Sequence, residues 1–456
     1  MAQSLQTIAT PQQLATSLQP LLINARLGLQ QAKGFVPAPV SLTPWQLSTS
    51  QWQQARIAAT LLGRLLERIA GDPCWLLQQT RALQDSASVP GEIWRTLSAI
   101  EPARLTSQNL NLSRHDLLLT AGGWRWVESN PIAAGMGPLS ARYQQLLATL
   151  LPLPYVDNPA LAAQAKLLAE AAIANAAGQP ALLVMVIAEQ EQNIFDQQLL
   201  TEAVRQHGVA TEWLTLNQLQ HGQARGDKGF YLTDGRRVSL LYWRTGYNPL
   251  PQTADYWAFR ASLEQTTLLQ CPNLAGQLSG SKWLQHQLGL LLQQPSGRQQ
   301  LAQRFGLSLA QLQLLQQLIV PSFAVADLTP EAVRAKLAAG YWYKTQQEGG
   351  GNVARYAQGW QRYQHYDSAD LLMAPIRPLI RSETFFSIKA GELLQSGNDI
   401  EQRGYEPAGG QISELGIFTL GSAASYGGYL CRSKAARSLE GGISHGAAVL
   451  ELIILD

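Results

Sequence analysis

A lysine, a glutamate and three consecutive glycines stand close together in the segment KTQQEGGGNVARY, residues 344–356. Three glycines let backbone N–H groups approach an anion without side-chain clashes, and Lys344 can neutralise phosphate oxygens. Glu348 offers the hard oxygen ligands that Mg²⁺ prefers. The segment is neither a Walker A loop nor a dinucleotide fingerprint, because both glycine patterns are absent. Taken alone, it fits both a lid over a nucleotide triphosphate and an ordinary flexible hairpin.

Two further segments place polar or charged side chains two residues apart. Glu128 and Asn130 in VESNPIAAGMG would share one face of a strand, where a carboxylate and an amide oxygen can hold Mg²⁺. Arg432 and Lys434 in CRSKAARSLEGG have the same spacing, which suits either an anion clamp or a solvated strand face. We find no Ser/His/Asp or Cys/His pattern beside them. Carboxylates, cations and glycine loops without a nucleophile favour phosphoryl chemistry.

Composition excludes several classes of function. The 456 residues carry a formal net charge of +2 and no Lys/Arg-rich run, so neither nucleic acid nor an anionic membrane is an expected partner. The longest apolar run, residues 181–188, is far shorter than the ~20 residues of a membrane span. A signal peptide is not expected, because residues 1–20 lack a basic and a continuous apolar part. Three distant cysteines fit a reducing cytoplasm, and we expect them to be small core residues.

Strands and helices must position these side chains. Residues 1 to about 110 look mostly helical, and the apolar spacing of WQQARIAATLLGRLLERIAG predicts a helix that ends at Gly71. From about residue 110 to residue 155, the segment HDLLLTAGGWRWVESN predicts a hairpin that turns at residues 121–123. The second strand of this hairpin would end with Glu128 and Asn130.

An α/β pattern follows from about residue 160 to residue 275. After an alanine-rich helix closed by Gly178, the strand ALLVMVI, the helix FDQQLLTEAVRQHG and the strand TEWLTL predict a strand–helix–strand unit. FYLTDGRRVSLLYWR predicts a hairpin with Asp234 and Gly235 in its turn. Beyond residue 276 we expect further helices, the strand YWYK that carries Lys344, the glycine loop and more strands. The chain is therefore predicted to be of the mixed α/β (α+β) class.

Seven segments resemble, in order and spacing, the eukaryotic-type glutathione synthetases, which are ATP-grasp ligases with a circularly permuted domain order. They are VESNPIAAGMGPLS, AEQEQNIFDQ, LLYWRTGYNP, QCPNLAGQLSGSK, YKTQQEGGGN, ISELGIF and RSKAARSLEGGISHGAAVL. The resemblance covers about residues 113–449, and EQNIFDQ, QEGGGN and SELGIF are its most specific parts.

This resemblance implies a fold and a division of the chain. The fold would be an ATP-grasp fold with a helical N-terminal region, an inserted α/β substrate-binding domain and a glycine-rich lid. The divisions would be residues 1–155, 156–275 and 276–456. The last of them would contain the lid, residues 344–356, and a C-terminal closing loop, residues 432–448.

The resemblance also implies a reaction. Members of that family join γ-glutamylcysteine to glycine with ATP and Mg²⁺, so this chain would be an ATP-dependent carboxylate–amine ligase. The dipeptide carboxylate would attack the γ-phosphate, and the amine of glycine would displace phosphate from the acyl phosphate. Such chemistry needs positioning and charge neutralisation rather than a covalent nucleophile. A cytoplasmic homodimer is implied as well.

Site residues follow from the same resemblance. The γ-glutamylcysteine contacts would be Arg114, Ile132, Ala133, Ala134, Gly135, Glu191, Asn193, Gln197, Arg244 and Tyr247. The contacts of glycine would be Arg432, Ile443 and Ser444, and the catalytic arginines would be Arg114 and Arg432. The ATP contacts would be Glu128, Lys282, Lys344, Glu348, Gly349, Gly350, Gly351, Asn352, Met373, Ile376, Glu414, Lys434 and Glu440. The Mg²⁺ ligands would be Glu128, Asn130 and Glu348. Among the ATP contacts, the lysines would bind the phosphates and Met373 to Ile376 would line the adenine pocket. Glu414 would bind the ribose hydroxyls.

Some positions depart from the family pattern. Ala133 and Gly135 stand where the family has two serines, and Ser444 stands where a small apolar residue is usual. These changes leave the exact donor dipeptide and the acceptor amino acid open, because a small pocket discriminates one methylene by only ~1–3 kcal/mol. Two other functions also remain open, namely an ATP-binding module without ligase activity and a phosphotransferase that stops at the phosphorylated carboxylate.

Overall fold

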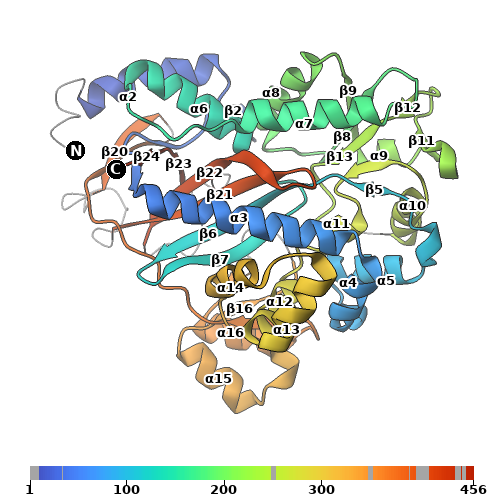
Figure 1. The fold of residues 1–456 in the computed structure, drawn as a ribbon. Coiled ribbons are helices and arrows are strands. Elements are labelled where there is room, and N and C mark those ends of the chain that lie inside the picture. Colours follow the sequence, from blue (N-terminus) through green and yellow to red (C-terminus); the bar gives the residue numbers. More distant parts are fainter. Residues whose placement is uncertain are drawn as a thin grey trace.

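The computed structural model describes residues 10–32, 34–247, 253–347, 353–389, 391–396, 410–436, 443 and 448–456. Helices and sheets are interleaved throughout this part of the chain, so the predicted mixed α/β class is confirmed (Figure 1). In Figure 1, α6 and α7 lie above the central sheet, α3 crosses in front of it, and α12 to α16 lie below. Among the residues described, no helix has both the length and the apolar character needed to cross a membrane.

An eight-stranded sheet forms the centre of the molecule. Its strands, in spatial order, are β20 (Glu392–Ser396), β19 (Phe385–Lys389), β3 (Val40–Ser41), β23 (Val449–Glu451), β22 (Ser425–Ala435), β21 (Gln411–Leu420), β6 (Leu112–Thr120) and β7 (Gly123–Asn130). N-terminal and C-terminal segments thus share one sheet. The predicted hairpin is confirmed as β6 and β7, which pair antiparallel.

The β6–β7 hairpin contains a register shift, because Asp116 faces Glu128 while Leu117 faces Trp126. Beyond the shift the alternation is regular, with Arg114 opposite Asn130. Glu128 and Asn130 therefore share a face of the sheet with Arg114 and Asp116, as the two-residue spacing predicts.

The two faces of the large sheet are covered differently. Helix α3 (Thr49–Ala70) packs its apolar side on one face, against core residues that include Leu117 and Ile417, and it ends at Gly71 as predicted. On the same face, His115 joins three strands through Ser129 Oγ at 2.7 Å and Thr419 Oγ1 at 2.9 Å. Part of the other face is covered by α6 (Gly137–Leu150) and α7 (Ala160–Ala174).

A five-stranded sheet, parallel throughout, contains the α/β part of the chain. Its order is β5 (Gln108–Asn109), β14 (Leu269–Cys271), β13 (Leu240–Trp243), β8 (Leu182–Ile187) and β9 (Ala210–Thr215). The predicted strand–helix–strand unit is confirmed as β8, α8 (Ile194–Arg205) and β9. The carboxyl ends of these parallel strands lie at one edge of the sheet, and α8 begins there. Side chains that follow the strands and those at the start of α8 are thereby placed together.

A four-stranded antiparallel sheet lies at the lower end of the molecule (Figure 1). Its order is β15 (Ser322–Ala324), β18 (Leu371–Met373), β16 (Trp342–Lys344) and β17 (Val353–Ala354). The predicted strand YWYK is confirmed as β16. Tyr343 and Leu372 share a small core with α15 (Pro330–Ala338), so the alternating residues Lys344 and Met373 face the opposite way, toward the rest of the molecule.

The remaining elements complete the layers. The other helices are α2 (Pro11–Asn24), α4 (Pro73–Gln79), α5 (Val89–Ser98), α9 (Leu216–Leu219), α10 (Ala254–Glu264), α11 (Leu274–Leu278), α12 (Lys282–Gln293), α13 (Pro295–Phe305), α14 (Leu309–Leu318) and α16 (Tyr356–Tyr363). The other strands are β1 (Gly28–Gln31), β2 (Gly34–Pro37), β4 (Trp45–Leu47), β10 (Gln223–Ala224), β11 (Phe230–Tyr231), β12 (Arg237–Val238) and β24 (Ile453–Leu455).

Three local predictions need correction. The alanine-rich helix ends at Ala174 with Asn175 as its C-cap, and Gly178 lies beyond it in the following turn with φ +77°. The segment that turns at Asp234 and Gly235 forms a hairpin only as far as β12, since β13 joins the parallel sheet. Cys271 and Cys431 are buried as expected, but Cys74 is exposed.

Glu67 in α3 gives the fold an expected pH dependence. Its largely buried carboxylate accepts a hydrogen bond from Asn109 Nδ2 at 2.7 Å, and burial raises its pKa from 4.5 to about 7 despite that bond. A carboxyl group with a raised folded pKa stabilises the protein below its unfolded pKa and loses that contribution as pH rises through the folded value. We expect the free energy of unfolding to fall by up to about 3 kcal/mol between pH 4.5 and about 7. Urea unfolding across this range should show a flatter profile for Glu67→Gln, and an equal slope would contradict the assignment to Glu67.

Candidate active site

A buried carboxylate, Asp116, connects side chains from three strands of the large sheet. Arg114 pairs with it through two contacts, Nε to Oδ1 at 2.6 Å and Nη2 to Oδ2 at 2.8 Å. Arg432 Nη2 donates to the same Oδ2 at 3.1 Å, and Asn130 Nδ2 donates to it at 3.0 Å. Three strands, β6, β7 and β22, thus meet at one side chain, and two of its partners are the predicted catalytic arginines.

The electrostatics of this cluster keep Asp116 ionised. Burial alone would raise its pKa, but Arg114 and Arg432 outweigh burial and hold the pKa below its usual range. Gly416 on β21 is necessary for the packing, because a Cβ there would lie 2.5 Å from Asp116 Oδ1 and 2.6 Å from Arg114 Cδ. The glycine of the SELGIF segment therefore makes room for the arginine–carboxylate pair.

Several of the predicted donor residues contact one another near Arg114. Arg114 Nη1 donates to the carbonyl of Gly135 at 3.3 Å, and Arg244 Nη1 donates to the carbonyl of Ala134 at 3.4 Å. A Cβ at Gly135 would lie 2.5 Å from Arg244 Nη2, so this glycine admits the guanidinium into the space of a side chain. Two arginines from different sheets thus hold adjacent carbonyls of one loop.

Asp196 also holds this loop, through backbone N–H groups that follow it. It is fully buried, and its carboxylate accepts from the backbone N–H groups of Met136 at 3.0 Å and Leu139 at 3.1 Å. It also pairs with Arg244 Nη2 at 3.4 Å. These backbone groups belong to the start of α6, where Met136 provides no side-chain cap, so Asp196 caps that helix from α8.

Several buried polar atoms in this region fit a polar ligand. Within the described residues, the side-chain oxygen and nitrogen of Gln197, Asn193 Oδ1 and Arg244 Nε have no hydrogen-bond partner. Gln197 is 1% exposed, and such groups are costly to bury unpaired. Glu191, whose Oε1 accepts from Asn193 N–H at 2.8 Å, adds a carboxylate beside Arg244. Carboxylate, arginine and unpaired amides together suit a zwitterionic head group.

Four of the predicted nucleotide residues lie near one another. Lys344 is buried, and its ammonium lies within electrostatic range of Lys282, Glu128 and Glu414. Burial lowers the pKa of Lys344, the neighbouring Lys282 lowers it further, and the two carboxylates oppose this. Two adjacent cations beside carboxylates form a site in which phosphate oxygens can replace water.

Arg432 and Glu414 also pair directly, across neighbouring strands β21 and β22. Burial alone would lower the pKa of Arg432, but Glu414 and Asp116 raise it, so the guanidinium stays charged. Both described contacts of Arg432 use Nη2, and a guanidinium has further donors for a ligand.

The donor set for a divalent cation is partly described. Glu128 and Asn130 share a face, and Asn130 donates its amide nitrogen to Asp116, which directs its amide oxygen elsewhere. Carboxylate and amide oxygens are suitable ligands for Mg²⁺. No group of three His, Cys, Asp or Glu side chains forms a metal site within the described ranges, and the third predicted ligand, Glu348, lies outside them.

Other predicted residues have mixed placements. Met373 lies on β18 opposite Trp342 and Ser322, on the same face as Lys344. Lys434 lies on β22 opposite Ile412. Ile132 and Ile443 are buried, whereas Tyr247 and Ile376 are half-buried. Ala133 has a backbone φ of +51°. Glu348, Gly349, Gly350, Gly351, Asn352, Glu440 and Ser444 lie outside the described residues.

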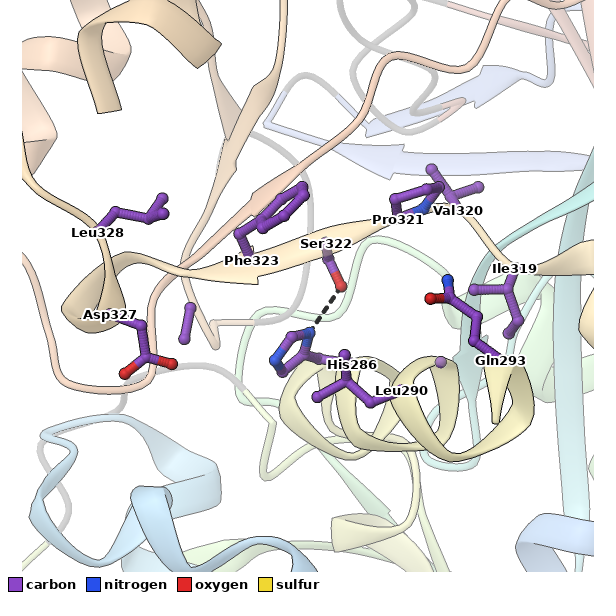
Figure 2. A pocket seen from close by; sticks show the side chains of 12 residues that line it. His286, Leu290, Gln293, Ile319, Val320, Pro321, Ser322, Phe323, Asp327 and Leu328 are labelled. Carbon is purple, nitrogen blue, oxygen red and sulfur yellow. Dashed lines mark hydrogen bonds between the residues drawn. The ribbon is translucent and has the colours of Figure 1, made fainter. Parts of the chain in front are cut away.

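A separate cavity of about 240 Å³ lies between α12 and β15 (Figure 2). His286 from α12 and Ser322 from β15 line it, and His286 Nδ1 contacts Ser322 Oγ at 2.9 Å. The rest of the lining is mainly apolar, including Leu290 and Ile319. None of the predicted site residues that the structure describes lines this cavity, and neither does Asp116.

The sequence interpretation missed two central residues, Asp116 and Asp196. Asp116 lies two residues after Arg114 in a strand, the same spacing that singled out Glu128 and Asn130. Asp196 lies inside EQNIFDQ, next to Gln197. A search for carboxylates two residues from a predicted site arginine would have found Asp116, whereas the contact of Asp196 with Met136 and Leu139 depends on the fold.

Comparison with known proteins gives one consistent family. Residues 5–455 match the family model for the ATP-binding domain of eukaryotic glutathione synthase. The chloroplastic glutathione synthetase of Solanum lycopersicum is 28% identical over 466 residues, which cover 94% of this chain and 80% of that protein. The glutathione synthetase of Homo sapiens is 26% identical over 448 residues, which cover 91% and 89%.

A solved structure agrees in fold. A glutathione synthetase-like effector from Globodera pallida, in its apo form, superposes with a TM-score of 0.66 over 98% of both chains at 14% identity. This similarity supports the fold alone. Since the family model spans nearly the whole sequence, the chain belongs to the eukaryotic glutathione synthase family of ATP-binding ligases.

Proposed function

We propose that this chain is a glutathione synthase that joins γ-glutamylcysteine to glycine while ATP is converted to ADP and phosphate. The observation that carries the proposal is the buried Asp116, which connects Arg114, a predicted donor contact, to Arg432, the predicted glycine contact. A ligase of this kind must bring a carboxylate, a phosphate and an amine to one point. A single carboxylate that fixes both arginines meets that requirement.

The donor site would hold the γ-glutamyl head. Glu191 would receive its ammonium group, and Arg244 would receive its α-carboxylate, with Gln197 and Asn193 supplying amide contacts. Arg114 would hold the reacting carboxylate at the C-terminal end of the dipeptide. Support comes from buried polar atoms of Gln197, Asn193 and Arg244 that have no hydrogen-bond partner in the described part of the chain and could bind a polar ligand.

The nucleotide site would hold the phosphates between the eight-stranded sheet and the four-stranded sheet. Lys282, Lys344 and Lys434 would contact the phosphates, residues 349–352 of the lid would cover them, Met373 and Ile376 would line the adenine, and Glu414 would accept from the ribose. Glu128, Asn130 and Glu348 would hold Mg²⁺, which supplies charge neutralisation at the transferring phosphoryl group. Glu440 would lie nearby on the closing loop.

The reaction would proceed in two displacements. A donor carboxylate oxygen attacks the γ-phosphorus, and ADP leaves with the bridging oxygen. The glycine amine, held through its carboxylate by Arg432 and closed in by Ile443 and Ser444, then attacks the acyl carbon, loses a proton and displaces phosphate. Positively charged side chains that are already in place stabilise both charged transition states without reorganisation.

The assembly and location are part of the same proposal. We infer a cytoplasmic homodimer without nucleic-acid or membrane partners, and the divisions 1–155, 156–275 and 276–456. The absence of a Lys/Arg-rich run and the sparse cysteines support the location and the lack of such partners.

The test is ADP release at fixed ATP and Mg²⁺ with a panel of donors and acceptors. The donors are γ-glutamylcysteine and γ-glutamyl-α-aminobutyrate, each combined with glycine, β-alanine, serine or no acceptor. Release that requires γ-glutamylcysteine and glycine, with a matching tripeptide mass, is the expected result. ADP release without any acceptor would instead favour a phosphotransferase.

Arg432→Ala should raise the KM for glycine. The lost contact is one between a guanidinium and a carboxylate, so we expect about a tenfold increase or more. The KM for γ-glutamylcysteine serves as the internal control and should change much less. An unchanged glycine KM would remove Arg432 from the acceptor site.

A further inference from the structure

The side chain of Gln346 joins the start of α12 to the four-stranded sheet. It is 2% exposed and lies two residues after Lys344, just beyond the end of β16. Its Oε1 accepts from the backbone N–H of Trp283 at 3.0 Å, and its Nε2 donates to the backbone carbonyl of Ala369 at 2.7 Å. Both polar ends of this buried amide are therefore used.

These contacts bring the two predicted phosphate lysines under one constraint. Trp283 directly follows Lys282, the first residue of α12, and Ser281 caps the helix by accepting from Leu284 N–H at 3.3 Å. Gln346 satisfies a second free N–H group at the same helix end. Lys282 Nζ also donates to the carbonyl of Gln347 at 2.8 Å. The start of α12 is therefore held by two successive residues, Gln346 and Gln347, that follow β16.

Such a constraint is needed because the two lysines carry like charges and repel each other. Lys344 is buried, and Lys282 is one of the charges that act on it. Like charges in a buried site favour separation unless covalent or hydrogen-bonded structure opposes it. A neutral amide can hold the two backbones together without adding charge to a site that must receive phosphates.

A second link between the same elements lies farther along the helix. His286 of α12 contacts Ser322 of β15 at the wall of the cavity in Figure 2. This link attaches α12 to the sheet as Gln346 does, but its partner strand β15 is separated from β16 by β18. The pair His286–Ser322 therefore serves as a matched control. It attaches α12 to the same sheet but does not involve the strand that carries Lys344.

We propose that Gln346 is a positioning residue that sets the spacing of Lys282 and Lys344 for the phosphates of ATP. This inference rests on the proposed function, because it takes both lysines as phosphate contacts. Gln346 acts through the backbone at Trp283 and Ala369 and touches neither the nucleotide nor the reacting atoms.

The test compares Gln346→Met with Ser322→Ala. Methionine has a similar length but neither hydrogen-bonding end, whereas Ser322→Ala removes the other link. We expect Gln346→Met to weaken ATP binding about tenfold by calorimetry, while the inhibition constant of adenosine, which has no phosphates, stays within about twofold of wild type. Ser322→Ala should leave both values near those of wild type, with a comparable loss of thermal stability.

Two outcomes would overturn the inference. One is unchanged ATP binding in Gln346→Met, and the other is equal weakening of ATP and adenosine, which would mean a general structural defect. If Gln346→Met does not fold, Gln346→Asn keeps a neutral amide on a side chain one methylene shorter, which is too short to keep both contacts with Trp283 and Ala369, and is judged by the same comparison. Wild-type ligation of γ-glutamylcysteine with glycine is measured on the same preparation, so failure of the proposed reaction is seen separately from failure of the Gln346 comparison.

Discussion

The variant Asp116→Asn is expected to lose about a thousandfold in kcat while remaining folded. Asparagine keeps the shape of the side chain but leaves Arg114 and Arg432 without the charge that holds them. Removing one partner of a buried ion pair costs about 3–5 kcal/mol. If the misplaced arginines stabilise the transition state less by a similar amount, the rate falls by about three orders of magnitude. Steady-state ligation and a thermal unfolding curve check the two parts of this expectation.

Glu451→Gln is the matched control for this variant. Glu451 is also a fully buried carboxylate, it pairs with Arg381 at 2.7 Å, and it lies on the large sheet. Its neighbours Cys431 and Ser433 alternate with Arg432, so it faces away from the site. We expect Glu451→Gln to lower the midpoint of unfolding with little change in kcat of the folded protein. Equal losses of kcat in both variants would mean that Asp116 acts only on stability.

Lys344→Met should be the second most damaging substitution. It removes a buried cation that we propose to contact the ATP phosphates, and charge-assisted contacts contribute about 1.5–3 kcal/mol each. We expect kcat/KM for ATP to fall about a hundredfold or more, with the KM for γ-glutamylcysteine largely unchanged. Lys336→Met is the control, because Lys336 lies over the ring of Phe323, with its Nζ 3.4 Å from the centroid, on the other side of the same sheet. A similar loss in Lys336→Met would make the effect one of folding.

The burial of Lys344 adds an expected pH dependence. Its pKa lies below its usual range because of burial and of Lys282. The ammonium that we propose to bind phosphate therefore loses its charge as pH rises, and this occurs at a lower pH than for an exposed lysine. The alkaline decline of kcat/KM for ATP should begin below the ordinary lysine range, and in Lys344→Met that decline should be absent.

Local patterns were sufficient for the elements that carry the site. The alternation in HDLLLTAGGWRWVESN identified the hairpin and placed Glu128 and Asn130 on one face, because strand periodicity is a local property. The strand that carries Lys344 was identified for the same reason.

The assembly of the site could not be predicted in the same way. Asp116 gains its role from partners on β7 and β22, and the register of β22 depends on pairing with β21, about 300 residues beyond β6 along the chain. Gln346 and Asp196 lie inside recognisable segments, yet their contacts with Trp283 and Met136 join elements that no local pattern relates. Cys74 was wrongly expected in the core because a single small residue carries no periodic signal.

The central claim is that a donor carboxylate is phosphorylated before the amine attacks it. The most direct measurement uses γ-glutamylcysteine labelled with ¹⁸O in its C-terminal carboxylate, with ATP, Mg²⁺ and glycine. We expect the phosphate released to carry one labelled oxygen from the donor, because the bridging oxygen of the acyl phosphate leaves with phosphorus. Release of unlabelled phosphate during tripeptide formation would contradict it.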